Sequence, residues 1–479
     1  MACLADVSPP IALTALDGRY RASVAPLVDH LSEAALNRER VRVEVEWLIH
    51  LTTGQIVPNV RALSADEQTR LLTLVEDFGP DDIAELAELE RETVHDVKAV
   101  EYFLKRRLAD MDDDAAGLAA VSELVHFACT SEDINNLSYA LMIKGAVEQV
   151  WLPRATALVE AIATMARDLR DVPLLARTHG QPATPTTMGK EVAVLAYRLQ
   201  RQLTRISRAE YLGKLNGATG TYGAHVAAVP EADWPAISKM FVESLGLTWN
   251  PLTTQIESHD WQAELYSDIA RFNRILHNLC TDFWTYISMG YFAQVRGQGT
   301  VGSSTMPHKV NPIRFENAEA NLEVSNALLD VLASTLVQSR MQRDLTDSSM
   351  QRNIGTAFGH SLLAIDNAGR GLAGLDAVPT VMAADLEANW EVLGEPIQSV
   401  MRALGAQGVE GMQNPYERLK ALTRGRRISG DDLREFVGSL GLPLDVERRL
   451  LEMTPQTYVG LAPRLVDYLG SARESTQQH

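Results

Sequence analysis

The sequence of 479 residues has few cysteines and no long hydrophobic run. Cys3, Cys129 and Cys280 are its three cysteines, and no two form a CxxC pair, which argues against a disulfide framework and against a thiolate metal site. No uncharged apolar run approaches the roughly 20 residues that a membrane-spanning helix needs. Residues 1–20 lack a basic segment followed by an apolar one, so we expect no secretory signal and a cytoplasmic protein.

Positive charge is also scarce. Lys and Arg total 44 against 62 Asp and Glu, which gives a formal net charge of -18. Such a surface repels a phosphate backbone, which argues against nucleic acid as a partner. With 46% hydrophobic and 22% charged residues, the composition is that of an ordinary soluble globular protein.

Strand-like alternation is nearly absent, and apolar residues instead recur at steps of three and four, which puts one apolar face on a helix. Helices of ~20 to 30 residues exceed the average of about 11 or 12 and predict an all-α fold with a central long-helix bundle. We expect an N-terminal helical domain over about 1–119, the bundle over 120–372 and a C-terminal helical domain over 373–479. The four apolar stripes are Ala155–Leu169, Val192–Ile206, Trp261–Ile287 and Leu322–Leu336.

The segment Gly297–Pro312 (GQGTVGSSTMPHKVNP) is the most unusual in the chain. Three glycines, two serines, a histidine and a lysine lie close together in it. The glycines would let the loop move, and a plain connector between helices, which is the alternative, seldom needs so many reactive groups.

A second segment, Arg177–Pro185, joins two predicted helices and contains His179. A lone histidine in a loop is more often a bystander. However, Pro182 and Pro185 restrict the local geometry, and a fixed imidazole can serve as a proton donor.

Three further segments combine polar and charged residues, and each also has a structural explanation. In His126–Asn136, Thr130 or Ser131 could cap the following helix, whose free N–H groups could equally bind an anion. Arg91–Lys98 could be a surface helix, and Arg340–Arg352 could be a solvated charged face. The residues alone indicate an α-helical enzyme for an anionic ligand and do not name the substrate.

Two patterns that suggest other chemistry are rejected. Gly297, Gly299 and Gly302 match the dinucleotide pattern GxGxxG, but a helical stripe and a proline flank them where that site needs a strand and a helix. Ser258–His259–Asp260 contains the residue types of a catalytic triad, but sequence neighbours do not converge in space. No metal-binding spacing such as HExxH occurs.

Taken in order, these segments resemble the fumarase/aspartase superfamily. Gly302–Pro312 is similar to its signature loop, and His308 after Pro307 resembles the adenylosuccinate lyase family, in its bacterial type, more than the fumarases. The resemblance spans about residues 11–465. The other matching segments are Asp17–Tyr20, His95–Tyr102, His126–Asn136, Arg177–Pro185 and Gln342–Ser348.

The resemblance implies a three-domain lyase that forms a homotetramer with a core of about 20 helices and with active sites shared between subunits. It implies β-elimination of fumarate from adenylosuccinate, giving AMP, and from the succinylated carboxamide ribotide SAICAR, giving AICAR. No metal or organic cofactor is implied.

The resemblance also implies roles for single residues. Ser303 is the implied general base, whose alkoxide the loop N–H groups and Lys309 could favour, and His179 is the implied general acid. A substrate with a phosphate and two carboxylates needs local positive charge. The implied substrate-binding residues are Arg19, Tyr20, His95, Asp96, Thr130, Ser131, Gln255, Ser304, Lys309, Asn311, Asn317, Arg343, Ser348 and Arg352.

Two positions depart from the family pattern, since Val94 stands where Asn is frequent and Thr300 where close relatives carry Glu. Two other functions stay open. A sister lyase, such as argininosuccinate lyase or aspartase, would keep the fold and the release of fumarate, but His308 and the His95–Asp96 segment argue against it. A non-catalytic scaffold could reuse the fold, although the presence of both implied catalytic residues argues against that.

Overall fold

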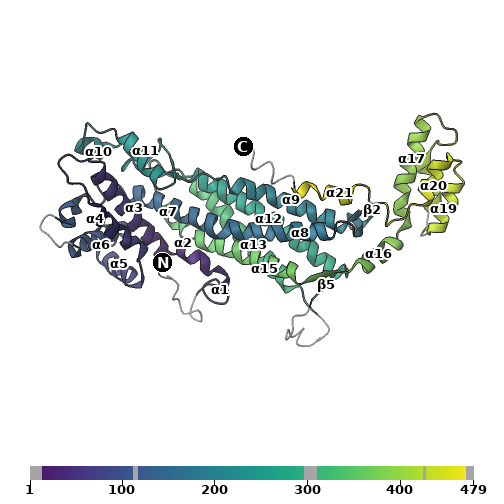
Figure 1. Cartoon of the computed structure of the whole chain (residues 1–479), viewed down its shortest axis with the longest axis horizontal. Coiled ribbons are helices and arrows are strands. Elements are labelled where there is room, and N and C mark those ends of the chain that lie inside the picture. Colours follow the sequence, from purple (N-terminus) through teal and green to yellow (C-terminus); the bar gives the residue numbers. More distant parts are fainter. Residues whose placement is uncertain (1–12, 112–116, 296–309, 424–427, 471–479) are drawn as a thin grey trace. The chain divides into compact units, whose positions relative to one another are not determined.

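The computed structural model describes residues 13–111, 117–295, 310–423 and 428–470, and its chain is mostly helical (Figure 1). The prediction of an all-α fold is confirmed. The helices up to residue 206 are α1 (Arg21–Val24), η2 (Ala25–Leu27), α2 (Val28–Leu31), α3 (Glu33–Thr53), α4 (Ala65–Glu76), α5 (Pro80–Thr93), α6 (Asp96–Asp110), η3 (Leu118–Leu124), α7 (Ser131–Gly145), η4 (Ala146–Trp151), α8 (Leu152–Asp168) and α9 (Met188–Ile206). The later helices are α10 (Gly223–Ala228), α11 (Trp234–Ser244), α12 (Asp260–Ser288), α13 (Ile313–Leu336), α14 (Thr346–Gln351), α15 (Ile354–Ala373), α16 (Pro379–Glu387), η5 (Trp390–Leu393), α17 (Gly394–Ala406), α18 (Pro415–Thr423), α19 (Gly430–Gly438), α20 (Leu444–Leu451) and α21 (Ala462–Leu465).

The chain divides into two compact units, each built from three segments. The first unit takes the described residues of Met1–Ala155, Gln202–Arg274 and Ala318–Asp366, and the second takes those of Thr156–Arg201, Ile275–Asn317 and Asn367–His479. The expected division into 1–119, 120–372 and 373–479 stays a prediction.

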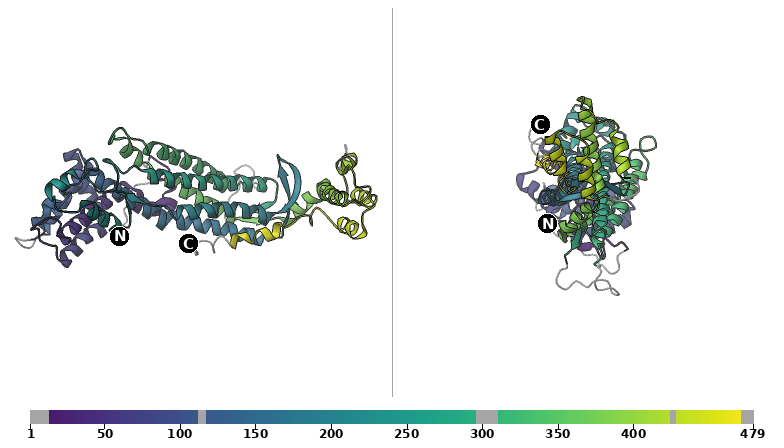
Figure 2. Two further views of the ribbon diagram at one scale, coloured as in Figure 1. Left: turned by 90° about the horizontal axis from the view of Figure 1, so that it is seen from above. Right: turned by 90° about the vertical axis from the view of Figure 1, so that its right-hand side faces the viewer.

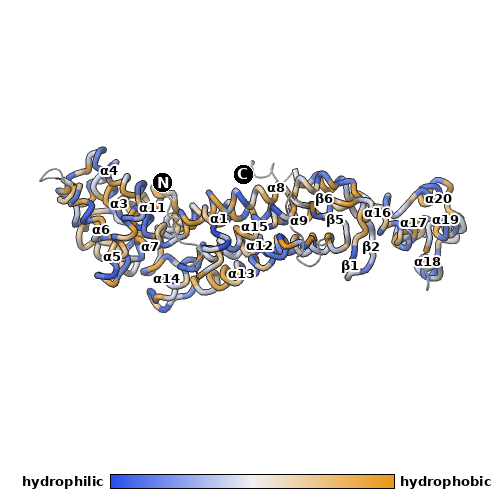
Figure 3. The backbone as a smooth tube through the Cα atoms, turned by 90° about the horizontal axis from the view of Figure 1, so that it is seen from below, coloured by the Kyte–Doolittle hydropathy of each residue, from blue (hydrophilic) through white to orange (hydrophobic). Residues whose placement is uncertain are grey.

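The four apolar stripes read from the sequence fall on α8, α9, α12 and α13, so the helical periodicity is confirmed. Apolar and polar residues alternate along these helices in Figure 3, as one buried face and one outer face require. The glycines of Gly369–Gly374 do not interrupt α15, which continues to Ala373. No helix among the described residues is long and apolar enough to cross a membrane.

Within the first unit, a buried chain of hydrogen bonds links three helices and the π-helical turn η4. Trp151 Nε1 donates to Ser361 Oγ (2.9 Å), and Ser361 donates to Asn273 Oδ1 (2.8 Å). Asn273 Nδ2 donates to Ser325 Oγ (3.1 Å), which donates to the carbonyl of Ala357 (2.8 Å). Buried polar groups are satisfied in this way, which fixes how α12, α13 and α15 pack.

Within the second unit, small residues let helices approach closely. A Cβ on Gly371 of α15 would lie 2.9 Å from the ring of Phe315 on α13, and Phe315 stacks on Phe283 of α12 with a centroid distance of 5.9 Å. A separate apolar cluster, centred on Met401 and Val437, joins α17, α19 and α20.

In the part of the chain that the structure describes, the strands are short and form three pairs: β1 (Pro173–Thr178) with β2 (Gln181–Thr187), β3 (Leu212–Gly213) with β4 (Thr248–Trp249), and β5 (Phe292–Gln294) with β6 (Leu375–Ala377). The β1–β2 hairpin is the longest pair and is drawn as two arrows in Figure 2. The sequence led us to expect a loop there, which is wrong. His179 and Gly180, both with positive φ (54° and 74°), form the two-residue turn that closes an antiparallel pair.

Candidate active site

The first part of the site is the N-terminus of α7, with Thr130 as the N-cap residue. The preceding segment is held against α3: Trp47 Nε1 donates to the carbonyl of Phe127 (3.1 Å), and the carboxylate of Glu44 accepts from the backbone N–H of His126 (2.9 Å). Cys129 follows, and burial raises the pKa of its thiol well above the usual value, so it stays protonated. The segment therefore presents helix N–H groups, which suit an anion.

Glu44 also lies 2.6 Å from Nδ1 of His126. Burial works against the charged imidazole, but the hydrogen bond and charge of Glu44, together with Glu101 and Asp133, outweigh it and raise the pKa of His126. The raised pKa favours the protonated imidazole of His126, whose charge is paired with that of Glu44.

One continuous chain of contacts joins four of the residues that the resemblance implied, namely Gln255, Arg343, Asp96 and Arg352. Arg343 NH1 lies 3.4 Å from Gln255 Oε1, and its NH2 lies 2.8 Å from Glu132 Oε1. Burial raises the pKa of Glu132, and the Arg343 guanidinium acts against that rise. A charged Arg343 therefore compensates a carboxylate in the first turn of α7.

The chain continues through two residues that sequence reasoning missed, Asn135 and Arg40. Asn135 Nδ2 donates to Glu132 Oε1 (2.8 Å), Arg40 Nε donates to Asn135 Oδ1 (2.9 Å), and Arg40 NH2 donates to Asp96 Oδ2 (2.6 Å). Burial tends to raise the pKa of Asp96, but Arg40 and Arg352 outweigh it and lower that pKa below the usual value. Asp96 is therefore a carboxylate that orients cations rather than a proton donor.

Arg352 ends this chain, since its NH2 lies 3.5 Å from Asp96 Oδ2 and its NH1 contacts Glu33. It also lines a cavity of about 370 Å³ together with Asp17 and Arg21, which flank the implied residues Arg19 and Tyr20. Arg19 is exposed, and Tyr20 packs on the apolar cluster of Leu16, Val24 and Leu363.

His95 lies at a junction between two helices rather than within a surface helix, so that alternative for Arg91–Lys98 is wrong. Val94 ends α5 in the left-handed conformation (φ 55°), and His95 caps α6, with Nδ1 accepting from the N–H of Lys98 (3.2 Å). Because Nδ1 accepts this hydrogen bond, a neutral His95 imidazole carries its proton on Nε2. The ring is exposed. His95 can thus donate to an anion in solvent.

The second unit carries His179 at the tip of the β1–β2 hairpin, where its side chain is exposed. No hydrogen bond to its imidazole is found among the residues that the structure describes. The strand beside the turn is fixed instead, since Arg177 NH2 lies 2.7 Å from Asp385 Oδ2 and its NH1 donates to Tyr291 Oη (2.9 Å).

Three implied residues of the signature loop, Ser303, Ser304 and Lys309, lie outside the described residues. Asn311 is exposed just after them, and Asn317 is half-buried in α13. Ser131 and Ser348 are half-buried in α7 and α14 of the first unit.

Sequence reasoning also missed two buried groups of the first unit. His259, set aside as part of a false triad, is buried with Nε2 3.5 Å from Asp347 Oδ2, so its place is structural. Lys214 is fully buried against Asp133. A lysine in the glycine-containing run Leu212–Gly220 was the available signal, and nothing local marks its partner.

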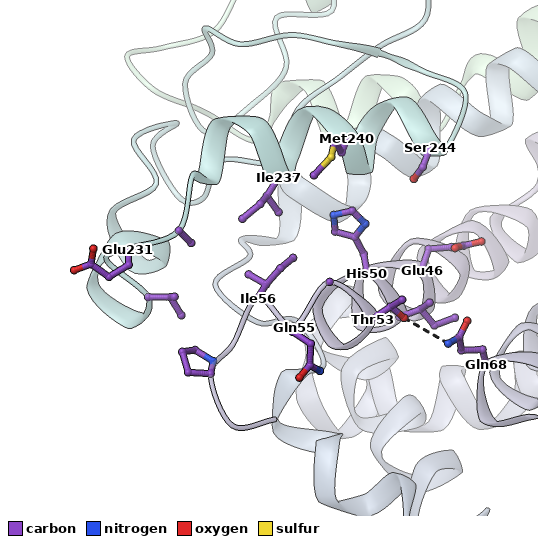
Figure 4. A pocket seen from close by; sticks show the side chains of 15 residues that line it. Glu46, His50, Thr53, Gln55, Ile56, Gln68, Glu231, Ile237, Met240 and Ser244 are labelled. Atoms are coloured by element: carbon purple, nitrogen blue, oxygen red, sulfur yellow. Dashed lines mark hydrogen bonds between the residues drawn. The ribbon is translucent and has the colours of Figure 1, made fainter. Parts of the chain in front are cut away.

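A different cavity, of about 700 Å³, lies between the C-terminal end of α3 and α11 (Figure 4). Ile56, Ile237 and Met240 give it apolar walls, and Glu46 and Glu231 are its charged residues. None of its lining residues is implied by the resemblance or is a Lys or Arg, so its charge does not suit an anionic substrate.

Comparisons with known proteins show the family and the fold of this chain. A family model described as Lyase matches residues 18–324, and one described as Adenylosuccinate lyase C-terminal matches residues 339–459. Similar folds are seen in a fumarate lyase from Mesorhizobium sp. BNC1 (TM-score 0.73, 19% identity, covering 92% of this chain and 96% of that one). A 3-carboxy-cis,cis-muconate lactonizing enzyme from Pseudomonas putida is also similar (TM-score 0.71, 19% identity, 94% and 97% covered).

The fold and these matches define an enzyme of the lyase class. Adenylosuccinate lyase of Escherichia coli (strain K12) is 49% identical over 464 residues, covering 97% of this chain and 100% of the relative. That of Vibrio cholerae is 47% identical over 465 residues, again covering 97% and 100%. The chain belongs to the adenylosuccinate lyase family.

Proposed function

We propose that this lyase eliminates fumarate from adenylosuccinate, leaving AMP, and from SAICAR, leaving AICAR. In both reactions a C–H proton leaves the carbon next to a carboxylate, the C–N bond breaks, and the departing nitrogen takes up a proton. The observation that carries the proposal is the chain of contacts from Gln255 through Arg343 and Asp96 to Arg352. It holds Arg343 beside the α7 N-terminus, where a phosphate or carboxylate can bind, and it holds Arg352 beside Asp96.

His179 is proposed as the general acid and Ser303 as the general base. The exposed imidazole at a two-residue turn supports the first role, because a proton donor must reach the leaving nitrogen. The second role rests on the similarity of Gly302–Pro312 to the family's signature loop. A serine needs an environment that favours its alkoxide, and the ammonium of Lys309 six residues later would supply charge for that.

The remaining implied residues are proposed to hold the substrate. Among the basic residues, Arg19 and His95 are exposed, and Arg343 and Arg352 are anchored by the acidic residues described above. A chain of net charge -18 thereby gathers positive charge where an anion is to bind. Tyr20, Thr130, Ser131, Asn311, Asn317 and Ser348 would add polar contacts, and Ser304 and Lys309 would act from the loop.

The proposed assembly is a homotetramer whose active sites combine residues of different subunits. Exposed apolar side chains on the long helices support association, because covering them in a subunit contact removes apolar surface from water. Val324 and Val331 on α13 are 45% and 42% exposed, and Tyr197 on α9 and Trp284 on α12 are 40% and 42% exposed.

Light scattering on the purified protein should give four times the chain mass, and Val331→Asp should lower this mass. A monomeric wild type that turns over substrate would contradict a shared site. Cytoplasmic location is part of the same proposal.

The test of the activity is direct. The purified protein is mixed with adenylosuccinate without added metal, absorbance is followed in the ultraviolet, and products are separated by chromatography. Equal amounts of fumarate and AMP are expected. Fumarate from argininosuccinate or aspartate but none from adenylosuccinate would contradict the proposal.

A further inference from the structure

The most deeply buried ion pair near the site joins Asp133, in the first turn of α7, to Lys214. Both side chains are 0% exposed, and Nζ lies 2.9 Å from Oδ1. Lysine is almost never fully buried without a partner. The proposed chemistry of the site does not use Lys214, so its place needs its own explanation.

The ion pair connects residues 214–217 to the N-terminus of α7. Asp133 Oδ2 accepts from the N–H of Thr130 (2.8 Å), and the two oxygens accept from the N–H groups of Asn216 (2.9 Å) and Gly217 (3.1 Å). Lys214 Nζ also donates to the carbonyl of Gly217 (3.1 Å). The ion pair therefore links the backbone of Asn216 and Gly217 to the backbone N–H of Thr130.

A second set of bonds aligns the same two segments. Asn136 Oδ1 accepts from the N–H of Lys214 (2.8 Å), and Asn136 Nδ2 donates to the carbonyl of Lys214 (3.0 Å). The lysine thus enters the interior at a fixed point of the chain. His225 packs beside Gly217 and is itself fully buried, and burial lowers its pKa, so Lys214 is the cation of this interior group.

Stability alone does not account for the pair, because two buried charges are often no more stabilising than apolar residues of the same size. The balance of charge at the α7 N-terminus does account for the pair. The first turn of α7 carries two buried carboxylates, Glu132 and Asp133, and both would repel an anion bound at the helix N-terminus. Arg343 lies 2.8 Å from the first and Lys214 lies 2.9 Å from the second, so each carboxylate has one matching cation.

We propose that Lys214 is a positioning residue that cancels the charge of Asp133 and thereby lets the α7 N-terminus accept the substrate's anionic group. This inference rests on the proposed function, because it assumes that Thr130 and Ser131 face an anionic substrate. It assigns Lys214 no contact with that substrate.

The test compares variants that lose the same ion pair but leave opposite charges. Lys214→Met leaves a buried carboxylate and should raise KM by about 10- to 30-fold, with kcat changed much less. Asp133→Asn leaves a buried cation and should leave KM unchanged or lower it. A purely structural role predicts that KM rises in both variants in step with the loss of stability, which is read from urea midpoints.

A second comparison avoids the variant that is hardest to fold. Asp133→Asn alone is compared with the same change combined with Lys214→Met, since neither variant contains an unpaired buried carboxylate. The proposal predicts a KM close to that of the wild type in the double variant, far below that of Lys214→Met, because no unpaired carboxylate remains to repel the anion. Lys239→Met, which removes a half-exposed lysine of α11, is the matched control and should keep the wild-type KM.

The outcomes distinguish the proposed function from the proposed role of Lys214. A wild type that does not turn over adenylosuccinate contradicts the proposed function. A wild type that turns it over, together with equal KM values in Lys214→Met and Asp133→Asn or a KM in the double variant as high as in Lys214→Met, contradicts only the role of Lys214.

Discussion

The two units hold their functional side chains in opposite ways. In the first unit, Arg343 and Arg352 are fixed by carboxylates that are themselves hydrogen-bonded, and the contacts run unbroken from Gln255 to Glu33. In the second unit, His179 is exposed on a two-residue turn and its imidazole has no described hydrogen bond, although Arg177, two residues before it, is paired with Asp385.

The difference matches what the two kinds of residue must do. Cations that bind an anion work best when they are oriented in advance, because little freedom is then lost on binding. A general acid must reach a leaving nitrogen and exchange its proton with solvent after each turnover. We infer that changes in the first unit mainly affect binding and stability, and that changes at the hairpin tip mainly affect kcat.

The largest effect is expected from the two residues proposed as general acid and general base. His179→Gln should lower kcat by about 100- to 10,000-fold, with an unchanged urea midpoint, because the imidazole is exposed. Ser303→Ala should abolish turnover. His277→Gln, on α12, is the matched control. Loss of the folded tetramer in either catalytic variant would count against a purely chemical role.

Arg343→Met is expected to act on binding and stability together. It removes the guanidinium 2.8 Å from the buried Glu132, which should cost about 2 kcal/mol of unfolding free energy and raise KM at least about 10-fold. Adding Glu132→Gln should restore most of the stability but not KM. Restoration of both by the second change would show that Arg343 only balances Glu132 and does not bind substrate.

Two glycines test the contrast between the base of the hairpin and its tip. A Cβ on Gly189 would lie 2.3 Å from the carbonyl oxygen of Ala166 and 2.5 Å from the backbone of Arg170, so Gly189→Ala should cost about 1 to 3 kcal/mol. A Cβ on Gly180 would meet nothing within 4 Å, and its φ is +74°, so Gly180→Ala should cost about 1 kcal/mol of backbone strain. Urea midpoints in the reverse order would contradict the packing at the base.

The His126–Glu44 pair should make stability depend on pH. The folded state raises the pKa of His126, so the pair contributes fully below the unfolded pKa of about 6.5 and its contribution is lost as pH rises through the folded pKa. The wild type should exceed His126→Gln in unfolding free energy by about 1 to 2 kcal/mol more at acidic than at alkaline pH. A difference that is constant, or that grows with pH, would be inconsistent with the raised pKa.

Val94→Asn should have the smallest effect, and it should be stabilising. Val94 is 88% exposed and has a left-handed φ of 55°, where a β-branched residue is strained and Asn is tolerated. A gain of about 0.5 to 1 kcal/mol in unfolding free energy is expected. A lower urea midpoint for Val94→Asn than for the wild type would mean that Val94 makes a contact that offsets the strain.

The long helices could be predicted from the sequence because their signal is local. The stripe Trp261–Ile287 needs only its own spacing to predict α12. The β1–β2 hairpin could not be predicted that way, since Pro182 and Pro185 do not suggest a strand and the His179–Gly180 turn needs positive φ at a histidine. The structure shows that such a strand is tolerated in a two-stranded pair, where both strands are edges.

The residues of the site likewise fall into those that a local pattern predicts and those that it does not. Motifs marked residues at element ends, such as Thr130 and His95, because capping and loop residues are recognisable locally. Arg40 and Lys214 were missed, because one lies inside a helix and the other is buried against a carboxylate 81 positions earlier in the numbering. Buried charge pairs depend on tertiary contacts that no spacing in the sequence encodes.

The most direct test of the account is steady-state release of fumarate from adenylosuccinate by the wild type, His179→Gln and Arg343→Met side by side. The account predicts turnover by the wild type, a large loss of kcat with a near-normal KM in His179→Gln, and mainly a raised KM in Arg343→Met. No fumarate from the folded wild type, or the same pattern of kcat and KM in both variants, would contradict it.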